Sequence, residues 1–159
     1  DLNEKEIACS LSHHFVYSHF MENSTKEYAL IFEDDFALDD KFKSISVTTL
    51  VNDVIDTRPK LNWDVVNLGR CADCCSAKCS VAQHELKQHG AFIVKSPNAY
   101  CANAYLVNRK GARVLMENSM PIQVISDDVL RDSGKKNLFN YYAIAPRIFR
   151  QRREEFGSE

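Results

Sequence analysis

Three consecutive carboxylates follow an apolar run in the first quarter of the chain. Glu33, Asp34 and Asp35 come directly after residues 28–32, which read YALIF. Such a run is typical of a buried strand in an α/β sheet, and ligands of open α/β sheets bind beyond the carboxyl ends of the strands. Because side chains alternate along an extended chain, we expect Glu33 and Asp35 to point one way and Asp34 the other. The sequence therefore indicates a two-carboxylate cation site, with a solvated acidic strand end as the alternative.

A second group of polar residues lies on the helices expected around this strand. Ser12 and His13 fall on an amphipathic helix predicted for residues 4–21, which Asn3 or Asp1 is expected to cap. Asp127 and Asp128 follow Ser126 at the start of another predicted helix. Taken alone, a histidine on such a helix is usually a packing or surface group, and an acidic pair at a helix start is often an N-cap.

The remaining pattern predicts elements that alternate along the chain. It indicates helices at residues 4–21, 42–57, 109–118 and 129–131, and strands at residues 28–32, 65–68, 91–94, 100–107 and 142–145. Asp39 and Asp40 are expected to cap the helix at 42–57. Gly111 and Ala112 are small enough to let the helix at 109–118 approach the sheet closely. This order favours an α/β fold with a mostly parallel sheet and flanking helices.

Length and composition limit the class of protein. The 159 residues fit a single domain, 45% hydrophobic and 26% charged, with a formal charge of −2. No basic stripe follows a predicted element, so nucleic acid is not expected as a partner. No apolar stretch reaches the roughly 20 residues that span a bilayer. The chain begins at Asp1 without a signal segment, which indicates a fragment or a processed product.

Cysteine usage indicates an oxidising compartment. Four of the six cysteines form a cysteine-rich loop insertion at residues 71–90: Cys71, Cys74, Cys75 and Cys79. Disulfides, a zinc knuckle and free thiols are all compatible with this cluster, although the adjacent Cys74 and Cys75 do not easily bind one ion. Cys101 lies on a strand expected beside the loop and is a candidate disulfide partner. The sequon at Asn23 agrees with a secretory environment.

Five segments, in order, resemble glycosyltransferase family 25, which includes bacterial lipooligosaccharide sugar transferases and procollagen galactosyltransferases. The first, residues 6–13 (EIACSLSH), resembles the family's EIGCxLSH, and residues 30–35 (LIFEDD) resemble its EDD strand. The others are residues 63–64 with 68–70 (WD and LGR), residues 104–112 (AYLVNRKGA) and residues 126–128 (SDD). Together they cover roughly residues 6–130.

The resemblance implies a GT-A type, Rossmann-like sandwich that binds a nucleotide-sugar through a divalent metal, Mn²⁺ or Mg²⁺. It also implies an inverting transfer of the sugar to a hydroxyl. Glu33 and Asp35 would hold the metal, with Asp34 facing the ribose or a neighbouring helix. Asp127 or Asp128 would act as the base, and Asp127 is alternatively a further metal ligand.

The resemblance also assigns residues of the first helix. Ser12 and His13 would line the donor site, and Cys9 would be a buried thiol. Three departures stand out: the family's preceding βαβ portion is missing, Ala8 replaces a glycine, and Asp128 is one methylene shorter than the usual glutamate. The missing portion again indicates a fragment of a longer domain.

The sequence thus predicts a metal-dependent enzyme that moves a hexose, with galactose as first choice, from a UDP-sugar to a glycan or protein hydroxyl. A non-catalytic binding module of the same fold is the alternative, and a zinc-stabilised interaction domain is a third. The expected location is the lumen of the endoplasmic reticulum or Golgi for a eukaryotic protein, and the cytoplasm for a bacterial or viral one.

Overall fold

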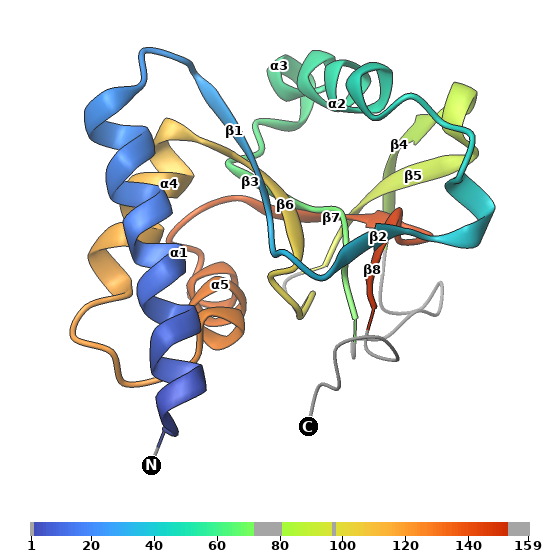
Figure 1. Cartoon of the computed structure of the whole chain (residues 1–159). Helices are drawn as coiled ribbons and strands as arrows, with labels where there is room; N and C mark the ends of the chain where they lie inside the picture. The colour runs from blue at the N-terminus through green and yellow to red at the C-terminus, as the bar shows by residue number, and fades with distance from the viewer. Residues whose placement is uncertain (1, 72–80, 97, 153–159) are drawn as a thin grey trace.

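The computed structural model describes residues 2–71, 81–96 and 98–152, which form a three-layer α/β sandwich around a mixed sheet (Figure 1). The six strands of this sheet are β1 (Tyr28–Phe32), β3 (Val65–Asn67), β4 (Val81–Leu86), β5 (Ala91–Lys95), β6 (Ala104–Asn108) and β7 (Tyr141–Ala145). Their order is β1-β6-β3-β7-β5-β4. Strand β6, which lies between β1 and β3, is buried along its whole length because both faces of the sheet are covered.

The expectation of a mostly parallel sheet is wrong. In the described part of this sheet only β3 and β7 pair in parallel, and the other four pairs are antiparallel. Two strands are the cause. Strand β6 inserts between β1 and β3 and runs opposite to both, with Leu30 opposite Leu106 and Val65 opposite Val107, and β5 runs opposite to its neighbours β7 and β4. An apolar strand covered on both faces has the same composition in either direction, so its sequence does not report its orientation.

Three helices cover one face of the sheet: α1 (Glu4–Asn23), α4 (Arg109–Asn118) and α5 (Ser126–Lys135) (Figure 1). A capping box starts α1, because Asn3 accepts from the Glu6 amide while the Glu6 carboxylate accepts from the Asn3 amide. The close approach predicted for α4 is confirmed. A Cβ added at Gly111 would lie 2.8 Å from the carbonyl oxygen of Asp64, on the segment that leads into β3.

The opposite face is covered by α2 (Val47–Asp56), α3 (Arg58–Leu61) and a second, two-stranded sheet. That sheet pairs β2 (Phe36–Leu38) with β8 (Phe149–Gln151) and was not predicted. The helix expected at residues 42–57 is divided, since the 3₁₀ turn η1 (Asp40–Phe42) precedes α2 and Ser46 caps α2. The prediction that Asp39 and Asp40 cap this helix is therefore wrong: Asp39 caps the short turn η1 by accepting from the Lys41 amide, and Asp40 is the first residue of that turn.

The core has one apolar cluster on each side of the sheet. Tyr17, Leu115 and Leu130 from the three helices pack on one face, with strand residues such as Val65 and Val107. Leu50 and Val54 of α2 pack on the other, together with the fully buried Trp63. Alternation along β3 and β6 supplies both clusters, which is why the buried strands read as continuous apolar runs.

One disulfide joins Cys71 after β3 to Cys101 before β6, which confirms the expected partner of the cysteine cluster. Cys74, Cys75 and Cys79 lie outside the described residues. The segment after them continues into β4, an edge strand that was not predicted, and into the 3₁₀ turn η2 (Lys87–His89). Across the described ranges, no helix is both long and apolar enough to cross a membrane.

Candidate functional site

A pocket of about 400 Å³ lies between α1 and the end of β1. Four of the residues singled out from the sequence line it: Ser12, His13, Glu33 and Asp34. Two elements bring them together, because Ser12 and His13 project from α1 while Glu33 is the first residue after β1. This is the position beyond a strand's carboxyl end where α/β sheets bind ligands.

The chain does not stay extended through the three carboxylates. Strand β1 ends at Phe32, and residues 34–35 form a turn that leads into β2, with the Phe36 amide 3.4 Å from the Glu33 carbonyl oxygen. The expected alternation of Glu33, Asp34 and Asp35 therefore does not hold. Asp34 is exposed and lines the pocket, whereas Asp35 is half-buried and is not among the lining residues.

Glu33 faces α1 rather than solvent. Its Oε1 lies 3.2 Å from Nε2 of His13, and its Oε2 accepts from the side-chain amide of Gln151 at 3.1 Å. Gln151 is the last residue of β8, so the small second sheet fixes one oxygen of this carboxylate while α1 fixes the other.

His13 is buried and carries a positive charge at neutral pH. Burial lowers its pKa, but hydrogen bonds to Cys9 and Glu33 and the negative charge of Glu33 outweigh burial and raise the pKa to about 9. Nε2 of the imidazolium then donates to Glu33, and Nδ1 donates to the Tyr105 hydroxyl at 2.9 Å. The Tyr105 hydroxyl lies 2.7 Å from that of Tyr17, and burial raises the pKa of both tyrosines, so both hydroxyls stay neutral.

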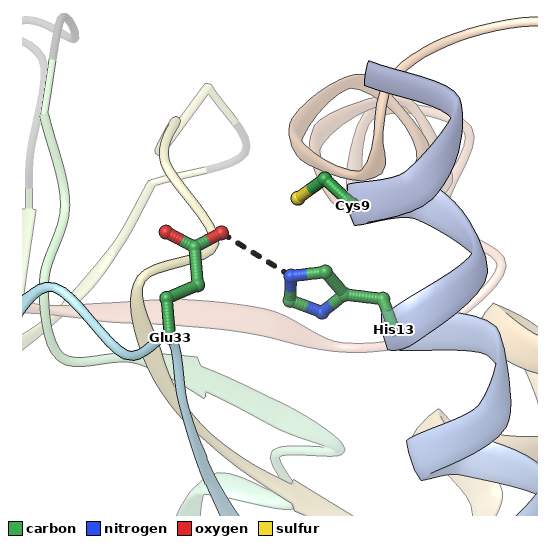
Figure 2. A group of neighbouring side chains, drawn as sticks. All are labelled: Cys9, His13 and Glu33. Atoms are coloured by element: carbon green, nitrogen blue, oxygen red, sulfur yellow. Dashed lines mark hydrogen bonds and ion pairs between the residues drawn. The ribbon is translucent and has the colours of Figure 1, made fainter. Parts of the chain in front are cut away.

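Cys9 completes a group of three potential metal ligands with His13 and Glu33 (Figure 2). Their ligand atoms all lie within 4.8 Å of one another. The expectation that Cys9 is a buried thiol is wrong, because it lies on the wall of the pocket and is exposed. Its Sγ is also 3.8 Å from the hydroxyl of Ser126, the first residue of α5.

Asp127 joins this region from the first turn of α5. Its Oδ1 accepts from the amide of Ala102 at 3.0 Å. The pKa of Asp127 is raised to about 6, mainly by burial and next by the negative charge of Glu33. The hydrogen bond from the Ala102 amide lowers the pKa, but by less than Glu33 raises it. The two carboxylates, more than 90 residues apart in the chain, are thus close enough to repel each other.

Asp128 has a different environment. Its Oδ1 forms an ion pair with Nη2 of Arg131 at 2.7 Å, one turn further along α5. The alternative that Asp127 or Asp128 is an N-cap is wrong, since the N-cap of α5 is Ile125. Of the two carboxylates, Asp127 is the one that interacts with Glu33 and His13.

A sequence model of glycosyltransferase family 25 (LPS biosynthesis protein) matches residues 1–130. The chain belongs to glycosyltransferase family 25. It is therefore a glycosyltransferase, and its mixed sheet with flanking helices fits a Rossmann-like enzyme of that kind. Sugar donors and acceptors are accordingly its partners. No curated protein matches the chain.

The family-like segments have distinct structural roles. Residues 6–13 lie on α1 and residues 30–35 on β1 and its turn, and both segments line the pocket. Residues 126–128 start α5 and reach the pocket wall through the contact of Ser126 with Cys9. Asp64 instead organises the fold: it is buried and accepts from Asn108, Lys110 and the Asn140 amide. These contacts tie β6, α4 and β7 together.

Four residues of the site were missed from sequence as functional candidates: Cys9, Tyr17, Tyr105 and Gln151. Tyr105 belongs to the family-like segment 104–112, which was a usable signal. Tyr17 falls four residues after His13, on the same helix face, so helical periodicity could have identified it. Gln151 carries no signal, because nothing local predicts β8.

Proposed function

We propose that this glycosyltransferase moves a hexose, with galactose as first choice, from a UDP-sugar to a hydroxyl of a glycan or protein, with inversion at the sugar carbon. One observation carries the proposal: Glu33 lines the pocket, and Asp127 on α5 lies close enough to interact with its charge. The imidazolium of His13 lines the same pocket and interacts with both carboxylates. A GT-A type donor site beyond the end of β1 is consistent with this placement.

Asp127 is the base in this proposal. An inverting displacement forms a bond between the acceptor oxygen and the sugar carbon as the bond from that carbon to the diphosphate breaks. The acceptor proton must move to a base, and a base works best with a pKa near the operating pH. The pKa of Asp127, raised to about 6, meets that condition. Asp128 instead stabilises the first turn of α5 through its ion pair with Arg131.

The leaving UDP develops negative charge that the site must stabilise. The imidazolium of His13 supplies one positive charge at the pocket wall, and the hydroxyl of Tyr105 orients it. The residues present also fit a divalent cation. Glu33 and Asp127 repel each other, which raises the pKa of Asp127, so the positive charge beside them does not fully balance their two negative charges. Mn²⁺ or Mg²⁺ would be held at the pocket by Glu33, and when bound it would neutralise charge on the diphosphate.

Substitution of Asp127 tests the assignment of the base. We expect Asp127→Asn to lower kcat for sugar transfer by about 10²–10⁴-fold, as loss of general-base catalysis does, with the KM for the donor changed by less than about threefold. Asp132→Asn is the matched control, since Asp132 lies on the same helix and pairs with Arg131 away from the pocket. Wild-type turnover by Asp127→Asn would rule out this base.

Donor binding is tested separately by calorimetric titration with UDP and Mn²⁺. We expect a metal-dependent heat that Glu33→Gln abolishes and that Asp127→Asn leaves in place. A non-catalytic module would give no metal-dependent heat. Heat without dependence on Mn²⁺ would contradict the cation part of the proposal while leaving the transferase part standing.

A further inference from the structure

We infer that Cys9, His13 and Glu33 form a binding site for one Zn²⁺ ion. In the part of the chain that the structure describes, these three side chains bring their potential ligand atoms within 4.8 Å of one another. The set offers one sulfur, one nitrogen and one carboxylate oxygen, the three kinds of protein ligand that zinc takes. Figure 2 shows the three side chains directed toward a common point between α1 and the end of β1.

The spacing of the ligands on α1 suits a chelate. Cys9 and His13 are four residues apart, so both project from the same face of the helix on adjacent turns. Helical metal sites with two ligands at positions i and i+4 use this same geometry. Because α1 is capped and continues for several turns beyond His13, the pair is held on a rigid element before any ion binds.

Glu33 adds the third ligand from outside the helix. Its Oε1 is 3.2 Å from Nε2 of His13, a separation close to that between neighbouring ligand atoms around a zinc ion with bonds of about 2.0–2.1 Å. Binding replaces the proton that Nε2 shares with Glu33 and releases the thiol proton of Cys9. The site closes around the ion when Sγ of Cys9 moves from its position within 4.8 Å of the other two ligand atoms to a bonding distance of about 2.3 Å from the zinc.

The outer contacts of such a site are already present. A histidine ligand usually donates its second ring N–H to an oxygen, which fixes the ring and the atom that binds metal. Here Nδ1 of His13 lies 2.9 Å from the Tyr105 hydroxyl, which in turn contacts Tyr17. Gln151 plays the matching role for Glu33, since it donates to Oε2 and leaves Oε1 toward His13.

The ligand set favours zinc over the cations expected for the transferase reaction. Thiolate and imidazole suit Zn²⁺, whereas Mn²⁺ and Mg²⁺ prefer oxygen ligands. Cys9 is exposed and all three residues line the pocket, so an ion can enter and a water or ligand can take a fourth position. This inference goes beyond the proposed function and can be tested apart from it, because zinc binding can be measured without any sugar transfer. With Zn²⁺ bound, His13 and Glu33 would be occupied as its ligands, and the ion would replace the His13 imidazolium as the positive charge at the pocket wall.

The test is metal titration of the protein in a background with Cys74, Cys75 and Cys79 replaced by serine, which removes the other candidate thiols. After treatment with EDTA, Zn²⁺ is titrated against a chromophoric chelator, and Co²⁺ is used as a spectroscopic probe. We expect one equivalent of Zn²⁺, and a thiolate-to-cobalt charge-transfer band. Cys9→Ser and His13→Gln should each weaken zinc binding by at least about tenfold, and Cys9→Ser should abolish the band.

His19→Gln is the control, since His19 is an exposed histidine of the same helix outside the pocket. It should bind Zn²⁺ like the parent, and circular dichroism of each variant should show the parent helix content. Unchanged zinc affinity in Cys9→Ser, or a cobalt complex without the charge-transfer band, would overturn the site. If the serine background does not fold, the same variants in the native-cysteine protein decide, because Cys9→Ser should then remove one of the bound equivalents.

Discussion

The surroundings of Asp127 disfavour its ionised form. It is held at the first turn of α5 by the Ala102 amide, yet burial and the charge of Glu33 both favour its protonated form. A folded protein gains nothing in stability from this arrangement. Such opposition is typical of functional sites, where a residue keeps a strained protonation state because the reaction needs it.

Replacement of Asp127 by asparagine should therefore stabilise the protein at high pH. The folded-state pKa of Asp127, about 6, lies above the ordinary value of 3.8 that it has in the unfolded chain. The stability that this proton contributes is therefore complete below pH 3.8 and is lost as the pH rises through about 6. We expect Asp127→Asn to raise the free energy of unfolding by about 1–3 kcal/mol near pH 8 and by almost nothing near pH 4. Urea titration without divalent cations at both pH values measures this difference.

Asp132→Asn serves as the control, because Asp132 pairs with Arg131 and its side chain is 39% exposed. It should show no such pH-dependent gain. A destabilising effect of Asp127→Asn at pH 8 would mean that Asp127 has a charged partner in the folded protein, and the assignment of a raised pKa would be wrong.

For single residues, the sequence predicted which side chains lie at the site but not the direction in which each side chain points. Ser12, His13, Glu33 and Asp34 were selected from sequence and do line one pocket. The direction of Asp35 was inferred from a strand that ends sooner, at Phe32, because the chain turns there to form β2. That turn depends on β8, more than 100 residues away, so no local signal reports it.

Elements with strong local signals were predictable from sequence. The Asn3 cap of α1 and the small residues at the start of α4 both correspond to contacts in the structure. The amphipathic pattern of α1 predicted a helix but not its buried face, since Ser10, His13, Tyr17 and Phe20 are buried while Ile7 and Phe15 are exposed. Strands β2 and β8 are only three residues long and were missed, since each is formed by pairing with the other rather than by its own propensity. Strand β4 was missed because its exposed residues give no continuous apolar run.

The close contact between α4 and β3 makes Gly111 intolerant of a side chain. An added Cβ would lie 2.8 Å from the Asp64 carbonyl oxygen and 2.9 Å from Cγ2 of Val65. We expect Gly111→Ala to lower the free energy of unfolding by about 1–3 kcal/mol, because overpacking outweighs the gain of up to about 1 kcal/mol in helix propensity. Thermal or urea unfolding of the purified variant measures the change.

The control for helix propensity is Arg113→Ala on the exposed side of α4. It should change stability by no more than about 0.5 kcal/mol. If Gly111→Ala proved as stable as the parent, the helix would have room to move away from the sheet, and the packing of α4 against β3 would be looser than the structure shows.

At the scale of the whole molecule, the site exists only where distant segments meet. The pocket is walled by α1 and the turn after β1, while Asp127 arrives on α5 and Gln151 on β8. The sheet order places β1 beside β6, so the residues just before β6 lie next to the carboxyl end of β1, and the Glu33 amide donates to the Asn103 carbonyl oxygen. The loop that precedes β6 therefore links the turn that carries Glu33 to Asp127 through the Ala102 amide.

The disulfide between Cys71 and Cys101 anchors this loop, and its loss should affect both stability and the site. It closes a loop with a sequence separation of 30 residues, for which the chain-entropy relation gives a stabilisation of about 3–4 kcal/mol. We expect the double variant Cys71→Ser, Cys101→Ser to lose about this much free energy of unfolding. Because Ala102 directly follows Cys101, the pH-dependent gain from Asp127→Asn should also shrink in this background, as Asp127 becomes more solvated. The single variant Cys101→Ser should lose as much stability as the double variant, and a reduced wild-type protein as stable as the oxidised one would show that the bridge does not constrain the fold.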